Sequence, residues 1–205
     1  MTSATRIRTA RMALVGVLVF PAPPLAAQAP TSDSLRALLA ARVAIGRNPG
    51  LIAAVITRDG TVSAAAGRAD SPDGAPLSPT TIFEIGSITK AITGTLFADA
   101  IARGEVREDE RVLDVLPDVP LPDSARGITL LDLATHRSGL ASFPVGYSPT
   151  DMADPWVGVT REVVYASLAR PGALRFFPGT RAEYSNVGAG LLGQALVARA
   201  QTRNP

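Results

Sequence analysis

Ile85-Gly86-Ser87-Ile88-Thr89-Lys90 sets the start of a helix, and the rest of the chain is organised around it. Apolar residues continue at helical spacing from Ile88 to Ile101, and Arg103-Gly104 is a plausible stop. Positions i and i+3 share one helix face, so the Lys90 amine can reach the Ser87 hydroxyl. We therefore expect Ser87 at a buried helix N-terminus, where free N–H groups favour developing negative charge.

Lys90 is the only lysine in a chain whose other basic side chains are all arginine. Arginine keeps its proton near neutral pH, whereas a desolvated lysine can act as a base. A short Ser-x-x-Lys pattern more often means a capping serine followed by a solvated lysine. Here the single lysine, the glycine before Ser87 and the apolar residues on either side favour a nucleophile and its base.

The segment before this stretch predicts a helix and a β-hairpin. Ser32 or Asp33 can cap the helix, whose apolar residues follow helical spacing as far as Val43. Residues 51–57 and 62–67 are expected to pair as strands around an Asp-Gly turn at 58–61.

The segment after it predicts three further helices separated by proline-rich loops. Little regular structure is expected over 105–127. Thr129 can cap a short helix over 130–135, Thr160 can cap one that ends near Ala169, and a last helix is expected over 187–200.

Tyr184-Ser185-Asn186 is a second group of candidate site residues. A phenol near a cation ionises more easily, so Tyr184 can share in proton transfer. The Asn186 amide can bind a substrate carbonyl or orient Lys90. The structural alternative is a buried tyrosine followed by an asparagine that caps the last helix, and Asn186 can do both.

His136 opens a rival mechanism, in which it pairs with Ser87 or Ser138 and with an acid such as Asp132. Neither serine lies in a Gly-x-Ser-x-Gly elbow, because Ile85 and His136 occupy the positions two residues before them. We favour the simpler interpretation that His136 ends a helix and makes local hydrogen bonds.

Residues 1–27 have the layout of a secretory signal peptide: three arginines, an apolar run over 12–20, and a segment ending in Ala-Ala. The alternative is an uncleaved anchor. Without the three arginines the chain has 17 basic and 18 acidic residues, which gives no support for nucleic-acid binding. We expect an exported protein, periplasmic or extracellular, with no stable membrane span after cleavage and an unknown oligomeric state.

Cysteine is absent and there is one histidine, so thiolate and multi-histidine metal sites are excluded within one chain. No cofactor and no metal ligands are expected.

Four ordered motifs carry a family resemblance: Ser87-Ile88-Thr89-Lys90, residues 130–140 (LLDLATHRSGL), Phe177-Pro178-Gly179-Thr180, and Tyr184-Ser185-Asn186. From about Ser32 onwards the chain resembles the class C beta-lactamase-like serine hydrolases, which include D-alanyl-D-alanine peptidases, beta-lactamases and esterases. The resemblance implies an α+β fold, in which an antiparallel sheet packed by helices adjoins a mainly helical region.

By the same resemblance, Ser87 is the acylated nucleophile, Lys90 its base or proton partner, Tyr184 the proton carrier for the leaving group, and Asn186 a contact to the substrate amide. The implied function is acyl transfer through a Ser87 acyl-enzyme on a beta-lactam, a D-Ala-D-Ala peptide or an ester, so the expected partner is a small-molecule or peptide substrate.

The family continues to a later strand carrying Lys-Thr-Gly or His-x-Gly, and this chain contains no Lys-Thr-Gly. We therefore expect residues 28–205 to form the N-terminal part of the domain, truncated and without the later strands of the sheet. The alternative function is an inactive fragment, or a non-catalytic protein that binds peptides or beta-lactams.

Overall fold

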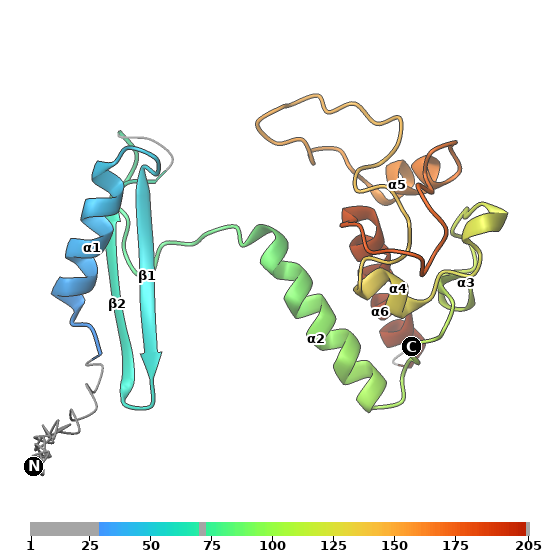
Figure 1. Ribbon diagram of the computed structural model, residues 1–205, viewed down its shortest axis with the longest axis horizontal. Coiled ribbons are helices and arrows are strands. Elements are labelled where there is room, and N and C mark those ends of the chain that lie inside the picture. The colour runs from blue at the N-terminus through green and yellow to red at the C-terminus, as the bar shows by residue number, and fades with distance from the viewer. Residues whose placement is uncertain (1–28, 70–72, 204–205) are drawn as a thin grey trace, which may run out of the picture. The chain divides into compact units, whose positions relative to one another are not determined.

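The computed structural model describes residues 29–69 and 73–203, which form two compact units that divide between Phe83 and Glu84 (Figure 1). The predicted signal peptide, residues 1–27, lies outside the described residues. Helices and a small antiparallel sheet confirm the predicted α+β class.

The first unit is a helix packed on a β-hairpin. Helix α1 (Ser32–Ala44) lies along strands β1 (Gly50–Thr57) and β2 (Gly60–Gly67), which pair antiparallel. The turn between them is Arg58-Asp59, and Thr57 pairs with Gly60, whose φ is +141°. A lone hairpin is marginally stable in water, so packing against α1 is what stabilises this one. The residues at that contact are Leu35, Leu39 and Ala64, with Leu51, Ala53, Val55, Val62 and Ala66 at its edge.

The second unit is helical. It contains the 3₁₀ turn η1 (Gly86–Ile88), α2 (Thr89–Ala102), α3 (Val112–Val115), the 3₁₀ turn η2 (Asp123–Ala125), α4 (Leu130–Ala134), α5 (Arg161–Leu168) and α6 (Asn186–Arg203). Thr129 and Thr160 cap α4 and α5 as predicted. Thr129 makes a full capping box with Asp132, because each side chain accepts from the other residue's backbone N–H at 3.1 Å.

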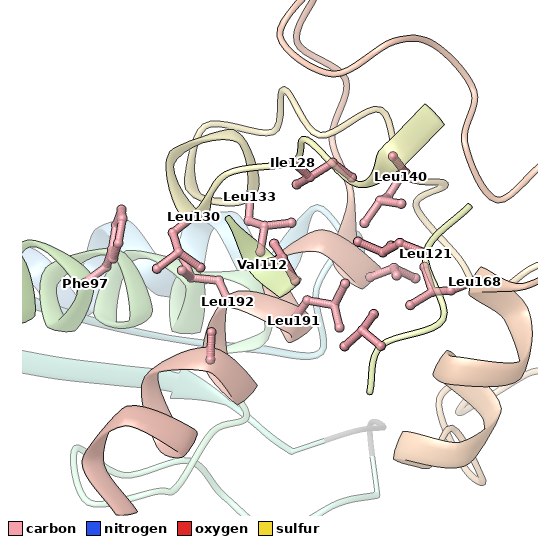
Figure 2. Close-up of a cluster of buried hydrophobic side chains, with 14 of the residues drawn as sticks. Phe97, Val112, Leu121, Ile128, Leu130, Leu133, Leu140, Leu168, Leu191 and Leu192 are labelled. Carbon is pink, nitrogen blue, oxygen red and sulfur yellow. The ribbon is translucent and has the colours of Figure 1, made fainter. Parts of the chain in front are cut away.

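Helix α6 is the spine of the second unit's core and packs against α2, α3 and α4. Figure 2 shows Leu191 and Leu192 of α6 among side chains from several other segments. Burying a side chain of this size contributes about 1.5–3 kcal/mol, so this cluster fixes the start of α6 relative to α2. The largest fully buried apolar side chains are Val112, Ile128, Leu130, Leu133, Leu140, Leu168 and Leu191.

Three local predictions were wrong. Thr31, and neither Ser32 nor Asp33, caps α1, because its side chain accepts from Ser34 N. The short helix α3 forms within the region expected to be irregular, since Val112 is fully buried and anchors it. Asn186 is the first residue of α6 and does not precede it as a cap.

The face that α2 presents to the core also differs from the prediction. Phe97 and Ala100 face the core of this unit and are 4% and 5% exposed. The predicted apolar stripe remains largely exposed, with Ile88 at 66%, Ile92 at 53% and Leu96 at 54%. Helix α6 packs against α2 in the described chain, and Phe97 and Ala100 are the residues of α2 that are buried.

Two distant segments, 136–141 and 173–185, are joined by backbone hydrogen bonds. Glycine N–H and carbonyl groups take part, with Gly179 N donating to Arg137 O at 2.8 Å and Arg175 N donating to Gly139 O at 2.8 Å. Gly139 has a φ of +76°, and a Cβ built there would lie 2.1 Å from Phe176 O. These contacts bring the 130–140 motif and the Phe-Pro-Gly turn together, just before Tyr184.

No helix in residues 29–69 and 73–203 is long and apolar enough to cross a membrane.

Replacing Gly139 by alanine is expected to destabilise the protein by about 2–5 kcal/mol, because the left-handed backbone costs about 1–2 and the displaced Phe176 carbonyl about 1–3. Gly172→Ala is the matched control, since its φ is +87° but no atom lies within 4 Å of the added Cβ. Urea unfolding followed by the circular dichroism of the helices measures the free energy of unfolding of both variants. Equal losses in the two variants would contradict the close approach of the two segments.

Candidate active site

Ser87, Lys90, Tyr184 and Asn186 meet at one place in the second unit. Lys90 Nζ donates to Ser87 Oγ at 3.3 Å and to Asn186 Oδ1 at 2.6 Å. Tyr184 Oη donates to Ser87 Oγ at 2.6 Å. The four residues selected from the sequence thus form one connected hydrogen-bonded group, although about a hundred positions separate the two pairs along the chain.

Local structure explains how the first pair, Ser87 and Lys90, and the second pair, Tyr184 and Asn186, are positioned. Ser87 lies in η1, which runs directly into α2, so one turn of helix carries Lys90 back towards the serine. Gly86 has a φ of +49°, a conformation that favours glycine and directs the chain into this turn. Asn186 opens α6, and Tyr184 stands two residues before it. The contact between α2 and α6 therefore brings the two pairs together.

Ser87 is exposed and Lys90 half-buried in the described chain, so the expectation of a buried serine was wrong. The flanking apolar residues are exposed themselves, Ile85 at 45% and Ile88 at 66%, and do not cover the hydroxyl. The serine is therefore open to a ligand. Its position at the start of α2 still places it near the positive end of the helix dipole.

The Lys90 ammonium is the main electrostatic influence on Tyr184. Its Nζ lies 4.9 Å from the centre of the tyrosine ring. The bond to Lys90 lowers the pKa of the Tyr184 phenol below its ordinary value, and the hydrogen bond with Ser87 lowers that pKa further. The ionised phenolate is consequently more accessible near neutral pH than that of an ordinary tyrosine.

His136 contacts this group but does not form the rival triad. Its Nδ1 accepts a hydrogen bond from Ser185 N at 3.2 Å, whereas a triad requires that nitrogen to donate to an acid. The Asp132 carboxylate is engaged by Thr129. Ser138 is 1% exposed, and its Oγ accepts from Leu140 N at 3.3 Å. The histidine side chain instead bonds to the segment around Tyr184, 49 positions along the chain at Ser185, so the expectation of local hydrogen bonds was wrong for the imidazole.

Asn186 joins the site to a neighbouring pocket of about 250 Å³. Its Nδ2 donates to Ser142 Oγ at 3.4 Å, a long bond, and nothing in the sequence pointed to Ser142. The pocket wall carries apolar and aromatic side chains, and Asn186 is the site residue that lines it. Its lining comprises Pro144, Trp156, Val159, Thr160, Arg161, Val164, Asn186, Val187, Gly190 and Gln194.

Within the described part of the chain, no group of three or more His, Cys, Asp or Glu side chains is placed to hold a metal ion.

Comparison with known proteins gives a family match over most of the chain. A family model described as Beta-lactamase matches residues 35–203. The chain is 31% identical over 157 residues to a protein named Beta-lactamase from Escherichia coli (strain K12), a match that covers 73% of this chain and 37% of that protein.

Solved structures are similar over the same region. D-amino acid amidase from Ochrobactrum anthropi SV3, complexed with D-phenylalanine, matches with a TM-score of 0.65 and 25% identity, over 84% of this chain and 46% of that one. A class C beta lactamase from Rhodobacter sphaeroides matches with a TM-score of 0.60 and 30% identity, over 81% and 44%. The chain thus spans less than half the length of each of these relatives.

The lowered pKa of Tyr184 predicts an early ionisation step, in which this phenol ionises at lower pH than an ordinary tyrosine does. Absorbance of the phenolate during an alkaline titration measures this. Lys90→Met is expected to move that early step towards the ordinary tyrosine pKa, since the cation that favours the phenolate is removed. Tyr184→Phe should remove the step altogether. An early ionisation step that is still present in Tyr184→Phe, or that is unchanged in Lys90→Met, would contradict its assignment to a Tyr184 phenol influenced by Lys90.

Proposed function

The chain belongs to the beta-lactamase family, and from that premise we propose that it acts by acyl transfer as a serine hydrolase, through an acyl-enzyme at Ser87. The observation that carries the proposal is the shared contact at the serine: Tyr184 Oη lies 2.6 Å and Lys90 Nζ 3.3 Å from the same oxygen. A serine hydroxyl is a weak nucleophile until a neighbouring base takes its proton, and these are the two groups placed to do so.

In the proposed reaction, Ser87 Oγ forms a bond to the carbonyl carbon of the substrate while its proton passes to Tyr184 in its phenolate form or to Lys90 in its neutral form. The helix dipole at the start of α2 favours the negative charge that develops on the carbonyl oxygen. As the carbonyl re-forms, its bond to the leaving group breaks, and the leaving nitrogen or oxygen takes a proton from Tyr184. Water then attacks the Ser87 ester and releases the acid, and the serine recovers its proton.

Asn186 is proposed as a contact to the substrate amide. Its Oδ1 is held by Lys90 at 2.6 Å, whereas its Nδ2 has only the 3.4 Å bond to Ser142. A substrate carbonyl can therefore replace the hydroxyl as the acceptor of that N–H group. Lys90 fixes the amide's orientation, because the carboxamide oxygen must face the ammonium.

The proposed substrates are a beta-lactam, a D-Ala-D-Ala peptide or an ester. All three offer an electrophilic carbonyl to Ser87, and the names of the E. coli relative and of the Rhodobacter structure favour the first. The amidase that gives the TM-score of 0.65 favours an amide of a D-amino acid as the second candidate. Comparing hydrolysis of nitrocefin, a D-Ala-D-Ala peptide, a D-phenylalanine amide and a p-nitrophenyl ester separates these substrates.

We also propose that the protein is exported, to the periplasm or beyond the cell. The support is the arginine-led apolar stretch over residues 1–27.

Labelling by a fluorescent penicillin or an activated phosphonate tests the nucleophile. We expect the label on Ser87 and its loss in Ser87→Ala, with mass spectrometry locating the modified peptide. Ser138→Ala is the matched control and should label at the rate of the unmodified protein, because Ser138 is buried and engaged with Leu140.

Labelling that persists in Ser87→Ala and disappears in Ser138→Ala would contradict the proposal in favour of the histidine mechanism. Labelling of Ser87 without release of product from any of these substrates would instead indicate a protein that binds without turnover.

A further inference from the structure

His136 is the one residue other than glycine, among those the structure describes, with a positive φ (+59°). Side chains with a Cβ adopt this left-handed conformation at a cost of about 1–2 kcal/mol. Surrounding contacts must therefore hold it, and strain of this kind is often found at functional sites.

Three contacts join His136 to the segment that carries Tyr184. Its backbone oxygen accepts from Glu183 N at 2.9 Å, and its Nδ1 accepts from Ser185 N at 3.2 Å. Its imidazole also packs against the Tyr184 ring, with 4.6 Å between the ring centres at an angle of 37°. The histidine therefore touches the residue before Tyr184, the ring of Tyr184 and the residue after it.

We propose that His136 is a positioning residue that holds the Tyr184 phenol against Ser87. It touches neither the serine nor any reacting atom, so its effect passes through Tyr184. The 2.6 Å bond from Tyr184 Oη to Ser87 Oγ depends on where the ring stands, and the imidazole supports the ring face while its nitrogen fixes the backbone beside it. The effect on catalysis rests on the proposed function, whereas the contact between His136 and Tyr184 does not depend on it.

The imidazole must be neutral for this role, because a protonated Nδ1 cannot accept from Ser185 N. Burial lowers the pKa of His136 from its ordinary value, and the positive charge of Lys90 lowers it further. Other charged side chains nearby have partners of their own: Asp132 with Thr129, Arg137 with the Gly179 carbonyl, and Glu183 with Arg175 and Arg181. Burial and the Lys90 charge both favour the neutral imidazole, so Nδ1 can accept the hydrogen bond at any pH above the lowered pKa of His136. As the pH falls through that pKa, Nδ1 is protonated and the hydrogen bond from Ser185 N is lost.

Two variants separate the side chain from the backbone. His136→Gly keeps the left-handed backbone but removes the ring and the acceptor. His136→Asn also tolerates a positive φ, and its Oδ1 occupies the place of Nδ1, so it keeps an acceptor for Ser185 N. Both should remain folded, which thermal unfolding checks.

The test measures the acylation rate constant and KM with a p-nitrophenyl ester, together with the pH at which Tyr184 ionises. His136→Gly is expected to lower the acylation rate about 10²-fold with little change in KM, as a misplaced catalytic group does. Its Tyr184 step should move towards the ordinary tyrosine pKa, because the phenol is no longer held beside Lys90. His136→Asn should restore most of the acylation rate and most of the lowering of the Tyr184 pKa.

An unchanged acylation rate and an unchanged Tyr184 step in His136→Gly would overturn the proposal. A His136→Asn protein no better than His136→Gly in both readouts would overturn the role of the Nδ1 hydrogen bond. The Tyr184 titration needs no substrate, so a protein that hydrolyses nothing would refute the proposed function while the titration still decides the role of His136.

Discussion

The site depends on one ammonium group with two acceptors. Lys90 Nζ contacts Ser87 Oγ within its own helical turn and Asn186 Oδ1 at the start of α6, so a single cation connects two segments that are 96 residues apart. The same charge lowers the pKa of the Tyr184 phenol and contributes to lowering that of His136. Without this cation, the Tyr184 phenol would lose the largest cause of its lowered pKa, and Asn186 would keep its long bond to Ser142 but lose the contact to Lys90. The fold must bring Lys90 and its two acceptors together, and the packing of α6 against α2 does so.

Two segments next to the site hold Tyr184 and Asn186 in place. Residues 136–141 and 173–185 are joined by backbone hydrogen bonds that need glycine at Gly139 and Gly179. Ser185 Oγ adds a bond to Ala141 O at 3.0 Å and accepts from Gly188 N at 2.9 Å, so the residue between Tyr184 and Asn186 is itself anchored. These contacts give the two site residues a rigid base, which is what preorganised catalytic geometry requires.

Much of this could be predicted from the sequence because it rests on local chemistry. The hairpin follows from an Asp-Gly turn between apolar runs, and the caps of α4 and α5 follow from Thr129 and Thr160. Contacts between distant segments could not be predicted in the same way. Periodicity along α2 could not show which face meets α6, and the apolar residues Ile88, Ile92 and Leu96 are exposed. The site residues were selected by their chemistry and by family resemblance, whereas the contacts of His136 and Ser142 depend on tertiary packing that leaves no local signal.

The rate at which Ser87 is acylated in Lys90→Arg tests whether Lys90 acts on the serine as a proton partner and not by its positive charge alone. Arginine keeps the positive charge but not the ability to give up a proton, so we expect a loss of at least about 10²-fold in the acylation rate constant. Arg126→Lys, a charge-conserving exchange at an exposed ion pair with Asp123, is the control and should leave the rate unchanged. A Lys90→Arg protein that acylates Ser87 at the rate of the unmodified protein would contradict the role of Lys90 in proton transfer.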